Sequence, residues 1–134
     1  TKKFGHVAVE RILSGPGIMN LYEALCQIYG KEMIYQSPSE VTAAAVNGEY
    51  DPLADETVQM FCKIFGSVAG SMALTVGALG GVYITSDLVR NFLDIFVASE
   101  FQKSFENKGR LQPVLEDIPV YLSKKKNLNI VLIV

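Results

Sequence analysis

Three consecutive polar residues, Thr85, Ser86 and Asp87, occupy the place in this chain best suited to bind a phosphorylated ligand. They follow the β-branched and aromatic run 82–84, which predicts a short buried strand, and they precede a helical pattern. Ligands of α/β folds bind beyond the carboxyl end of such a strand, at the N-terminus of the next helix. We therefore predict nucleotide binding at this turn. Asp87 is also a good N-cap, which leaves a structural role open.

The other reactive side chains indicate no second chemical centre. Cys26 and Cys62 both fall inside apolar helical patterns, which predicts two reduced core thiols rather than a disulfide or a metal pair. His6 is the single histidine, so a histidine-based metal site is not expected. The formal net charge is −2, and the basic run 124–126 is typical of a solvated turn, so a nucleic-acid partner is not expected.

The stretch Thr57–Asp87 must position the predicted nucleotide turn. Its first part predicts a long helix, and Gly80-Gly81 ends that helix because each glycine costs about 1 kcal/mol relative to alanine. Gly66 and Gly70 lie one turn apart and would let another backbone approach closely. We expect burial on both faces, because one face is large and apolar and the other is small and uncharged. The large face comprises Met60, Phe61, Ile64, Phe65, Val68, Met72 and Val76, and the small face comprises Ala69, Ser71, Ala73 and Thr75.

The absence of charge between Lys63 and Asp87 leaves a membrane span as an alternative. The spacing of Gly66 and Gly70 also matches the small-xxx-small pattern of membrane helices. Against this alternative, Gly80-Gly81 breaks the run, and the helix that remains is expected to be too short for roughly 30 Å of hydrocarbon. The chain also has no tryptophan and no basic cluster beside the run. A membrane partner is therefore not expected.

Turn residues divide the remaining chain into helices and strands. Ser37-Pro38-Ser39-Glu40 predicts a capping box with proline at the first helical position, and Asp51-Pro52 repeats the cap-plus-proline start for the central helix. Residues 14–17 predict a turn, and Gly30 predicts a helix end. The expected helices are Ile18–Tyr29, Ser39–Val46 and Leu88–Phe105, the last ended by Lys108-Gly109, and the expected strands are Val82–Ile84, Ile118–Leu122 and Ile130–Val134.

A series of segments, in order, resembles the bacterial-type glucokinase family. The most specific is Glu10-Arg11-Ile12-Leu13-Ser14-Gly15-Pro16-Gly17, within the matching run that starts at Gly5. The resemblance covers the chain up to Leu122. It implies an α/β, helix-rich fold, the carboxyl-terminal part of an actin-like ATPase (RNase H-like) domain, with 1–134 as a single partial domain. The other matching segments are 20–22, Phe61-Cys62, Ala73-Leu74, Gly77, Gly80–Ile84, Phe105–Arg110 and Asp117–Leu122.

The resemblance also implies residue roles. Glu10 aligns with a family glutamate that accepts hydrogen bonds from sugar hydroxyls, a task that suits a two-oxygen charged acceptor. From the residues alone, a solvated Glu10 or one paired with Arg11 is the plainer interpretation. The family's phosphate-binding glycine motif, catalytic aspartate and Glu-Gly-Gly-His sugar motif all lie upstream of the matching region, and His6 is not that sugar-binding histidine. The family has two glycines beside adenosine where Ser86 and Asp87 stand here, and its final helix is not recognisable after Leu122.

The resemblance implies that the chain is part of a cytoplasmic, homodimeric glucokinase, which phosphorylates glucose to glucose 6-phosphate with Mg-ATP. These residues would supply one glucose contact, at Glu10, and part of the adenosine pocket, at Thr85, Ser86 and Asp87. Alone they are expected to be inactive, because the catalytic motifs lie upstream. The alternative is a non-catalytic remnant or a regulatory sugar-binding module on the same scaffold.

Overall fold

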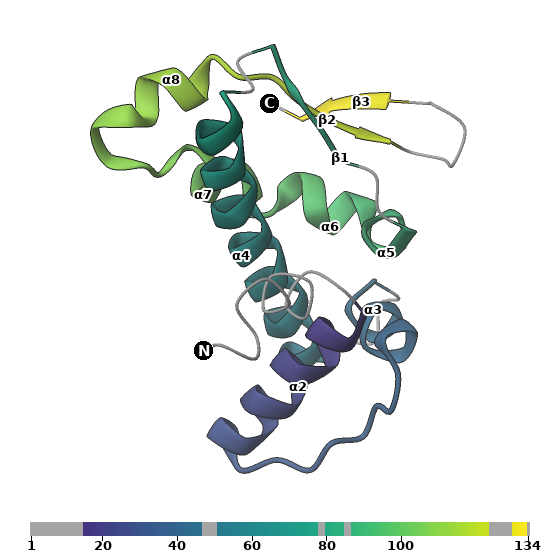
Figure 1. Ribbon diagram of the computed structural model, residues 1–134. Helices are drawn as coiled ribbons and strands as arrows, with labels where there is room; N and C mark the ends of the chain where they lie inside the picture. The colour runs from purple at the N-terminus through teal and green to yellow at the C-terminus, as the bar shows by residue number, and fades with distance from the viewer. Residues whose placement is uncertain (1–14, 47–50, 78–79, 85–86, 124–129, 134) are drawn as a thin grey trace. The chain divides into compact units, whose positions relative to one another are not determined.

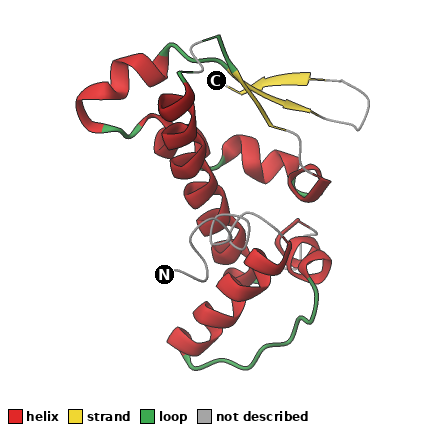
Figure 2. Cartoon of the chain, viewed as in Figure 1, coloured by secondary structure: helices red, strands yellow, loops and turns green. Residues whose placement is uncertain are grey.

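The computed structural model describes residues 15–46, 51–77, 80–84, 87–123 and 130–133, and helices make up most of them (Figures 1 and 2). The described residues fall into two compact units, which divide within the long helix α4 between Phe61 and Cys62. The helices are α2 (Gly15–Tyr29), α3 (Pro38–Val46), α4 (Pro52–Val76), α5 (Asp87–Arg90), α6 (Leu93–Ala98), α7 (Phe101–Glu106), the 3-10 turn η1 (Gly109–Leu111) and α8 (Gln112–Glu116). The strands are β1 (Val82–Ile84), β2 (Val120–Ser123) and β3 (Ile130–Ile133).

The amino-terminal unit is built from α2, α3 and the start of α4. α2 begins at Gly15, so the prediction of a turn over 14–17 is wrong for its last three residues: proline suits the first turn of a helix, where its missing N–H is not needed. The helix ends as predicted at Gly30, which has a φ of 64°. The buried side chains of this unit include Ile18, Tyr22, Leu25, Cys26, Val41, Ala54, Val58 and Phe61.

Both predicted helix starts in this unit are confirmed. At α3, the Glu40 N–H donates to the Ser37 hydroxyl at 3.3 Å, and that hydroxyl donates to the Glu40 carboxylate at 3.1 Å. At α4, the N–H groups of Leu53 and Ala54 donate to Asp51 Oδ1 at 3.0 and 3.2 Å. A carboxylate at this position satisfies amides that have no partner within the helix, and it complements the helix dipole.

The carboxyl-terminal unit carries a three-stranded sheet in the order β1-β2-β3. β1 pairs parallel with β2, with Val82 opposite Val120, and β2 pairs antiparallel with β3, with Val120 opposite Ile133. Parallel neighbours need a long crossover, and α5 to α8 provide it. The three predicted strands are confirmed, although β2 begins two residues after Ile118, because Pro119 has no N–H to give to the ladder.

The single helix predicted over Leu88–Phe105 is wrong, because three short helices, α5, α6 and α7, replace it. At the second break, the Ser99 hydroxyl donates to the Phe96 carbonyl at 2.6 Å and accepts from the Phe101 N–H at 3.2 Å, which takes over the backbone bonds of a continuing helix. The breaks let successive phenylalanines point into one core: Phe92, Phe96, Phe101 and Phe105 are each 1% exposed or less. The rings of Phe96 and Phe101 lie 4.7 Å apart.

The expectation that α4 is buried on both faces is also wrong. Its buried stripe in the carboxyl-terminal unit consists of small residues, Gly66, Ala69, Gly70 and Ala73, whereas Met72 is 58% exposed. The close approach predicted at the two glycines is confirmed. A Cβ on Gly66 would overlap the carbonyl oxygen of Phe101, and one on Gly70 would overlap that of Phe105. Small residues face α7 because they let its backbone touch α4.

The length of α4 bears on the membrane alternative. Its 25 residues span about 37 Å, enough to cross a bilayer, but its uncharged part, from Ile64 to Val76, spans only about 20 Å, as expected. By length and composition alone, residues 52–75 could cross a membrane. Within the protein, 44% of the most apolar stretch of this helix is buried. Asp55, Glu56 and Lys63 lie inside the helix, so its uncharged part begins only at Ile64.

Candidate functional site

The junction between β1 and α5 is the predicted nucleotide turn. Because β1 and β2 are parallel, their carboxyl ends lie at the same edge of the sheet. The chain leaves β1 at that edge and enters α5 at Asp87, one residue before the predicted helix start. Ile84 is 6% exposed and Val89 is fully buried, so apolar anchors hold the turn on both sides. This placement agrees with the general location of ligands in open α/β sheets.

The start of β1 is fixed as firmly as its end. Gly81 has a φ of 143°, which favours glycine, and its Cβ position would lie 3.3 Å from the Tyr121 ring. The next residue, Val82, donates its N–H to the Pro119 carbonyl at 2.9 Å. These contacts set the register of β1 against β2 and thereby determine where the chain emerges at the edge.

The structure describes only part of the predicted site. Glu10, Thr85 and Ser86 lie outside the described residues, and Asp87 is described in its backbone as the first residue of α5. The two cysteines are confirmed as free and buried, one in each unit. Burial raises the pKa of the Cys62 thiol to about 11, against a smaller opposing effect of a hydrogen bond with Ser99, so this thiol is protonated and unreactive at neutral pH.

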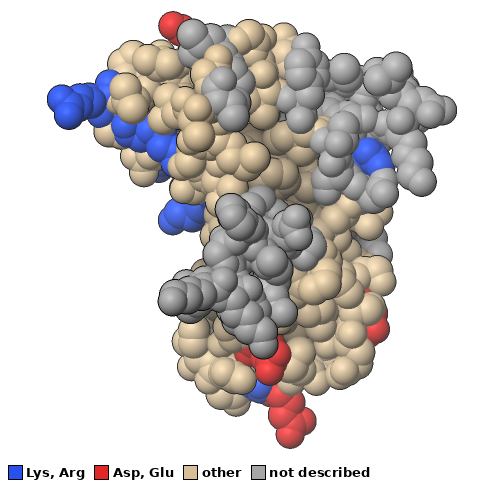
Figure 3. Space-filling view, in the orientation of Figure 1, with Lys and Arg blue, Asp and Glu red and all other residues tan. Residues whose placement is uncertain are grey.

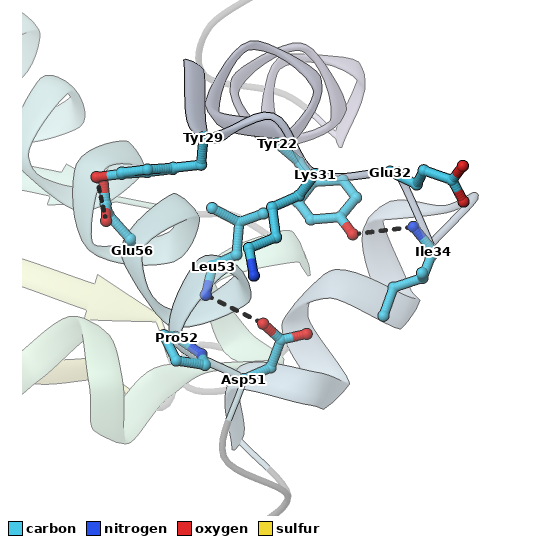
Figure 4. A pocket seen from close by; sticks show the side chains of 9 residues that line it. All are labelled: Tyr22, Tyr29, Lys31, Glu32, Ile34, Asp51, Pro52, Leu53 and Glu56. Carbon is cyan, nitrogen blue, oxygen red and sulfur yellow. Dashed lines mark hydrogen bonds between the residues drawn. The ribbon is translucent and has the colours of Figure 1, made fainter. Parts of the chain in front are cut away.

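The amino-terminal unit contains a cavity of about 630 Å³ that the sequence did not indicate (Figure 4). It lies between the end of α2, the connection that follows it and the first turn of α4. Its apolar surface comes from Tyr22, Ile34, Pro52 and Leu53. The side chains of Tyr29, Lys31, Glu32, Asp51 and Glu56 add polar groups to the lining.

Hydrogen bonds between distant residues hold the walls of this cavity. The Tyr29 hydroxyl donates to the Glu56 carboxylate, with both oxygens at 3.1 Å, and the Ile34 N–H donates to the Tyr22 hydroxyl at 3.1 Å (Figure 4). The hydrogen bond to Glu56, together with its negative charge, raises the pKa of Tyr29. The Tyr35 hydroxyl donates to Asp51 Oδ2 at 2.5 Å. The cavity is therefore a formed feature of the unit.

Asp51 remains ionised beside this cavity. Its partial burial acts to raise the pKa of the carboxyl group, but the hydrogen bonds from Tyr35 and from the amides of Ala54 and Leu53, with the positive charge of Lys31, outweigh burial and lower it. The carboxylate thus serves as the cap of α4 and as a fixed negative charge in the cavity wall.

The family model for Glucokinase matches residues 1–131. The chain belongs to the glucokinase family. Among curated relatives, the glucokinase of Hahella chejuensis is 48% identical over 121 residues, which cover 90% of this chain and 37% of that protein. The glucokinase of Klebsiella pneumoniae is 43% identical over 127 residues, which cover 93% of this chain and 39% of that protein.

A solved glucokinase has the same fold over most of this chain. The crystal structure of glucokinase from an Antarctic psychrotroph superposes with a TM-score of 0.80 and 32% identity, over 88% of this chain and 36% of that one. The resemblance drawn from the sequence is confirmed. The chain spans little more than a third of the length of these glucokinases.

Sequence reasoning missed two groups of residues in this member of the glucokinase family. The first group lines the cavity, where Tyr29 is hydrogen-bonded to Glu56. These two residues lie 27 positions apart in the sequence, and no local sequence pattern indicates such a pair. Lys108 was predicted only to end a helix, yet its ammonium donates to the Ser67 carbonyl at 2.8 Å and to the Ser71 hydroxyl at 2.9 Å. The one signal for this contact was the close spacing of Gly66 and Gly70, which brings α7 and the following Lys108 against α4.

Proposed function

We propose that this chain is the carboxyl-terminal part of an enzyme that phosphorylates glucose with Mg-ATP to give glucose 6-phosphate. The observation that carries the proposal is the match of residues 1–131 to the Glucokinase family, supported by relatives named glucokinase at 42–48% identity. The proposal includes an actin-like ATPase fold in which both compact units belong to one partial domain. The parallel β1–β2 pair with a helical crossover supports this assignment.

Glu10 is proposed as the glucose ligand. A carboxylate accepts hydrogen bonds from two adjacent hydroxyl groups at once, and charged acceptors form the stronger bonds. The support for this role is the position of Glu10 at the head of the motif that continues to Gly17. No catalytic residue is assigned to this chain, because the motifs of phosphoryl transfer belong to the upstream part of the family.

Thr85, Ser86 and Asp87 are proposed to form part of the adenosine pocket. The support is their place between β1 and α5, at the carboxyl edge of a parallel strand pair. The family has glycines where Ser86 and Asp87 stand, so we expect the added side chains to narrow this pocket. The proposal further places the enzyme in the cytoplasm, as a homodimer that binds neither nucleic acid nor membrane.

A kinase assay on the longest protein made from the gene tests the proposal. With glucose and Mg-ATP, we expect turnover on the order of the 1–100 s⁻¹ typical of kinases. Glu10→Gln should weaken glucose binding by roughly 1.5–3 kcal/mol, because it removes the charge of a hydrogen-bond acceptor while keeping its shape. Glu23→Gln, on the exposed surface of α2, is the matched control and should leave glucose binding unchanged.

Two results would contradict the proposal in different ways. If the glucose dependence of turnover is unchanged in Glu10→Gln, Glu10 is not the glucose ligand, but the proposed kinase activity stands. A protein that binds glucose and does not turn over would instead identify the regulatory sugar-binding module.

A further inference from the structure

The cavity of the amino-terminal unit has the size and construction of a small-molecule site. Its volume of about 630 Å³ lies within the usual range of roughly 300–1,000 Å³ for such sites. Its walls are fixed by hydrogen bonds between residues far apart in the sequence, such as Tyr29 with Glu56. Its described lining residues all lie between Tyr22 and Glu56, and none of them has a role assigned in the proposed phosphorylation.

The charge around the cavity favours a cation. In residues 15–46 and 51–61, Lys31 is the single basic side chain. Against it stand six carboxylates: Glu23, Glu32, Glu40, Asp51, Asp55 and Glu56. In Figure 3, red acidic atoms predominate over blue ones at the bottom of the view, where this unit lies. Three of the six, Glu32, Asp51 and Glu56, line the cavity itself.

The carboxylates of Glu56 and Asp51 can each accept further hydrogen bonds. Tyr29 has a single hydroxyl hydrogen, so it occupies one of roughly four lone-pair sites on Glu56. Asp51 accepts from two amides and from the Tyr35 hydroxyl, which leaves about one site. An ammonium group, with only donors, complements both carboxylates.

The rest of the lining suits an apolar body attached to that ammonium. Pro52 and Leu53 present apolar surface from the first turn of α4, and Ile34 is 65% exposed where it borders the cavity. The Tyr29 ring, held by Glu56 and 52% exposed, offers a face for a cation or a second ring. Lys31 projects toward the same space in Figure 4.

We propose that this cavity binds an organic ammonium ion with an apolar body, such as an arylalkylamine. The ammonium lies against Glu56 and Asp51, and the body covers Leu53 and Ile34. In the empty cavity Lys31 supplies the positive charge that partly balances Asp51. The ammonium of Lys31 is thus an internal competitor of the ligand, and its removal should tighten binding.

Calorimetric titration of the full chain with three probes of one shape tests the proposal. 2-Phenylethylamine carries a positive charge, 2-phenylethanol is neutral and 3-phenylpropionate is negative. We expect the amine to bind about tenfold more tightly than the alcohol, and the carboxylate more weakly than either. Glu56→Gln should weaken amine binding by about tenfold, whereas Lys31→Gln should strengthen it about threefold.

Glu23→Gln is the matched control, because it removes the same charge from the same unit outside the cavity, and it should leave the amine affinity unchanged. Circular dichroism establishes that each variant is folded. If Glu56→Gln does not fold, the expected increase in amine affinity of Lys31→Gln tests the proposal by itself. The proposal is overturned if no probe saturates, if Lys31→Gln weakens amine binding, or if the alcohol binds as well as the amine. It is also overturned if Glu56→Gln changes only the self-association of the chain, since the cavity would then receive a protein side chain.

Discussion

At the residue scale, Asp51 combines a structural contact with a place in the cavity wall. It caps α4 through two amides, accepts the Tyr35 hydroxyl and lines the cavity. Its pKa is lower in the folded protein than the ordinary value near 3.9. A lowered pKa means that the carboxylate stabilises the fold above the ordinary pKa, and that this contribution disappears as the pH falls through the folded value.

Replacement of Asp51 should therefore destabilise the protein in a pH-dependent way. Asp51→Ala should lower the free energy of unfolding at pH 7 by about 1–2 kcal/mol, because α4 loses its cap. Asp51→Asn retains a capping oxygen but not the charge, so its difference from the parent should shrink between about pH 5 and pH 2. Urea unfolding at a series of pH values measures both effects. A difference that stays constant with pH would show that the charge of Asp51 contributes nothing.

At the scale of elements, the contact between α4 and α7 depends on residues without side chains. Gly66→Ala places a methyl group on the Phe101 carbonyl. We expect overpacking to cost about 1–3 kcal/mol, offset by about 1 kcal/mol of helix propensity, for a net loss of up to about 2 kcal/mol. Chemical denaturation provides the measurement.

Gly80→Ala is the control for this substitution. Gly80 has no atom within 4 Å of its Cβ position, and its φ is outside the left-handed region. This change should leave stability within about 0.5 kcal/mol of the parent or raise it slightly. Equal losses at Gly66 and Gly80 would mean that α7 does not rest on the α4 backbone.

The turn between β1 and α5 should trade ligand access for helix stability. Ser86→Gly with Asp87→Gly removes two side chains and a negative charge, which in the proposed pocket would repel a phosphate about 6–8 Å away by roughly 2 kcal/mol at an effective dielectric near 20. In the full-length enzyme we expect tighter ATP binding and a slightly lower Tm, because serine is a good capping residue and the negative charge of Asp87 in the first turn of α5 complements the helix dipole. Calorimetric titration with ATP and thermal unfolding, both carried out on the same variant, measure the two expected changes. Unchanged ATP affinity would place the adenosine pocket elsewhere.

At the scale of the whole molecule, both units expose large apolar side chains. Ile28 and Val46 in the amino-terminal unit are 74% and 46% exposed, and Met72 and Val97 in the other are 58% and 50% exposed. We expect these 134 residues, expressed alone, to self-associate, because apolar surface of this kind is normally covered by other parts of a protein or by a second subunit. Sedimentation velocity across a range of concentrations measures this. A strictly monomeric species at every concentration would contradict it.

The sequence by itself determined the features that depend on neighbours along the chain. The capping residues Ser37 and Asp51, the helix end at Gly30 and the β-branched run of β1 all act within a few positions, and the structure confirms each. The glucokinase family was likewise readable, because its motif at Glu10–Gly17 is local and specific.

Tertiary structure decided what depends on distant partners. The helix predicted from Leu88 to Phe105 divided at residues 91–92 and again at Ser99, because three segments together bury their phenylalanines better than one straight helix facing one way. Where α4 meets α7 its buried residues proved to be small, because backbone contact at Gly66 and Gly70 excludes larger side chains. The cavity between Tyr29 and Glu56 was beyond prediction for the same reason: two side chains 27 residues apart meet only after α2 and α4 have packed.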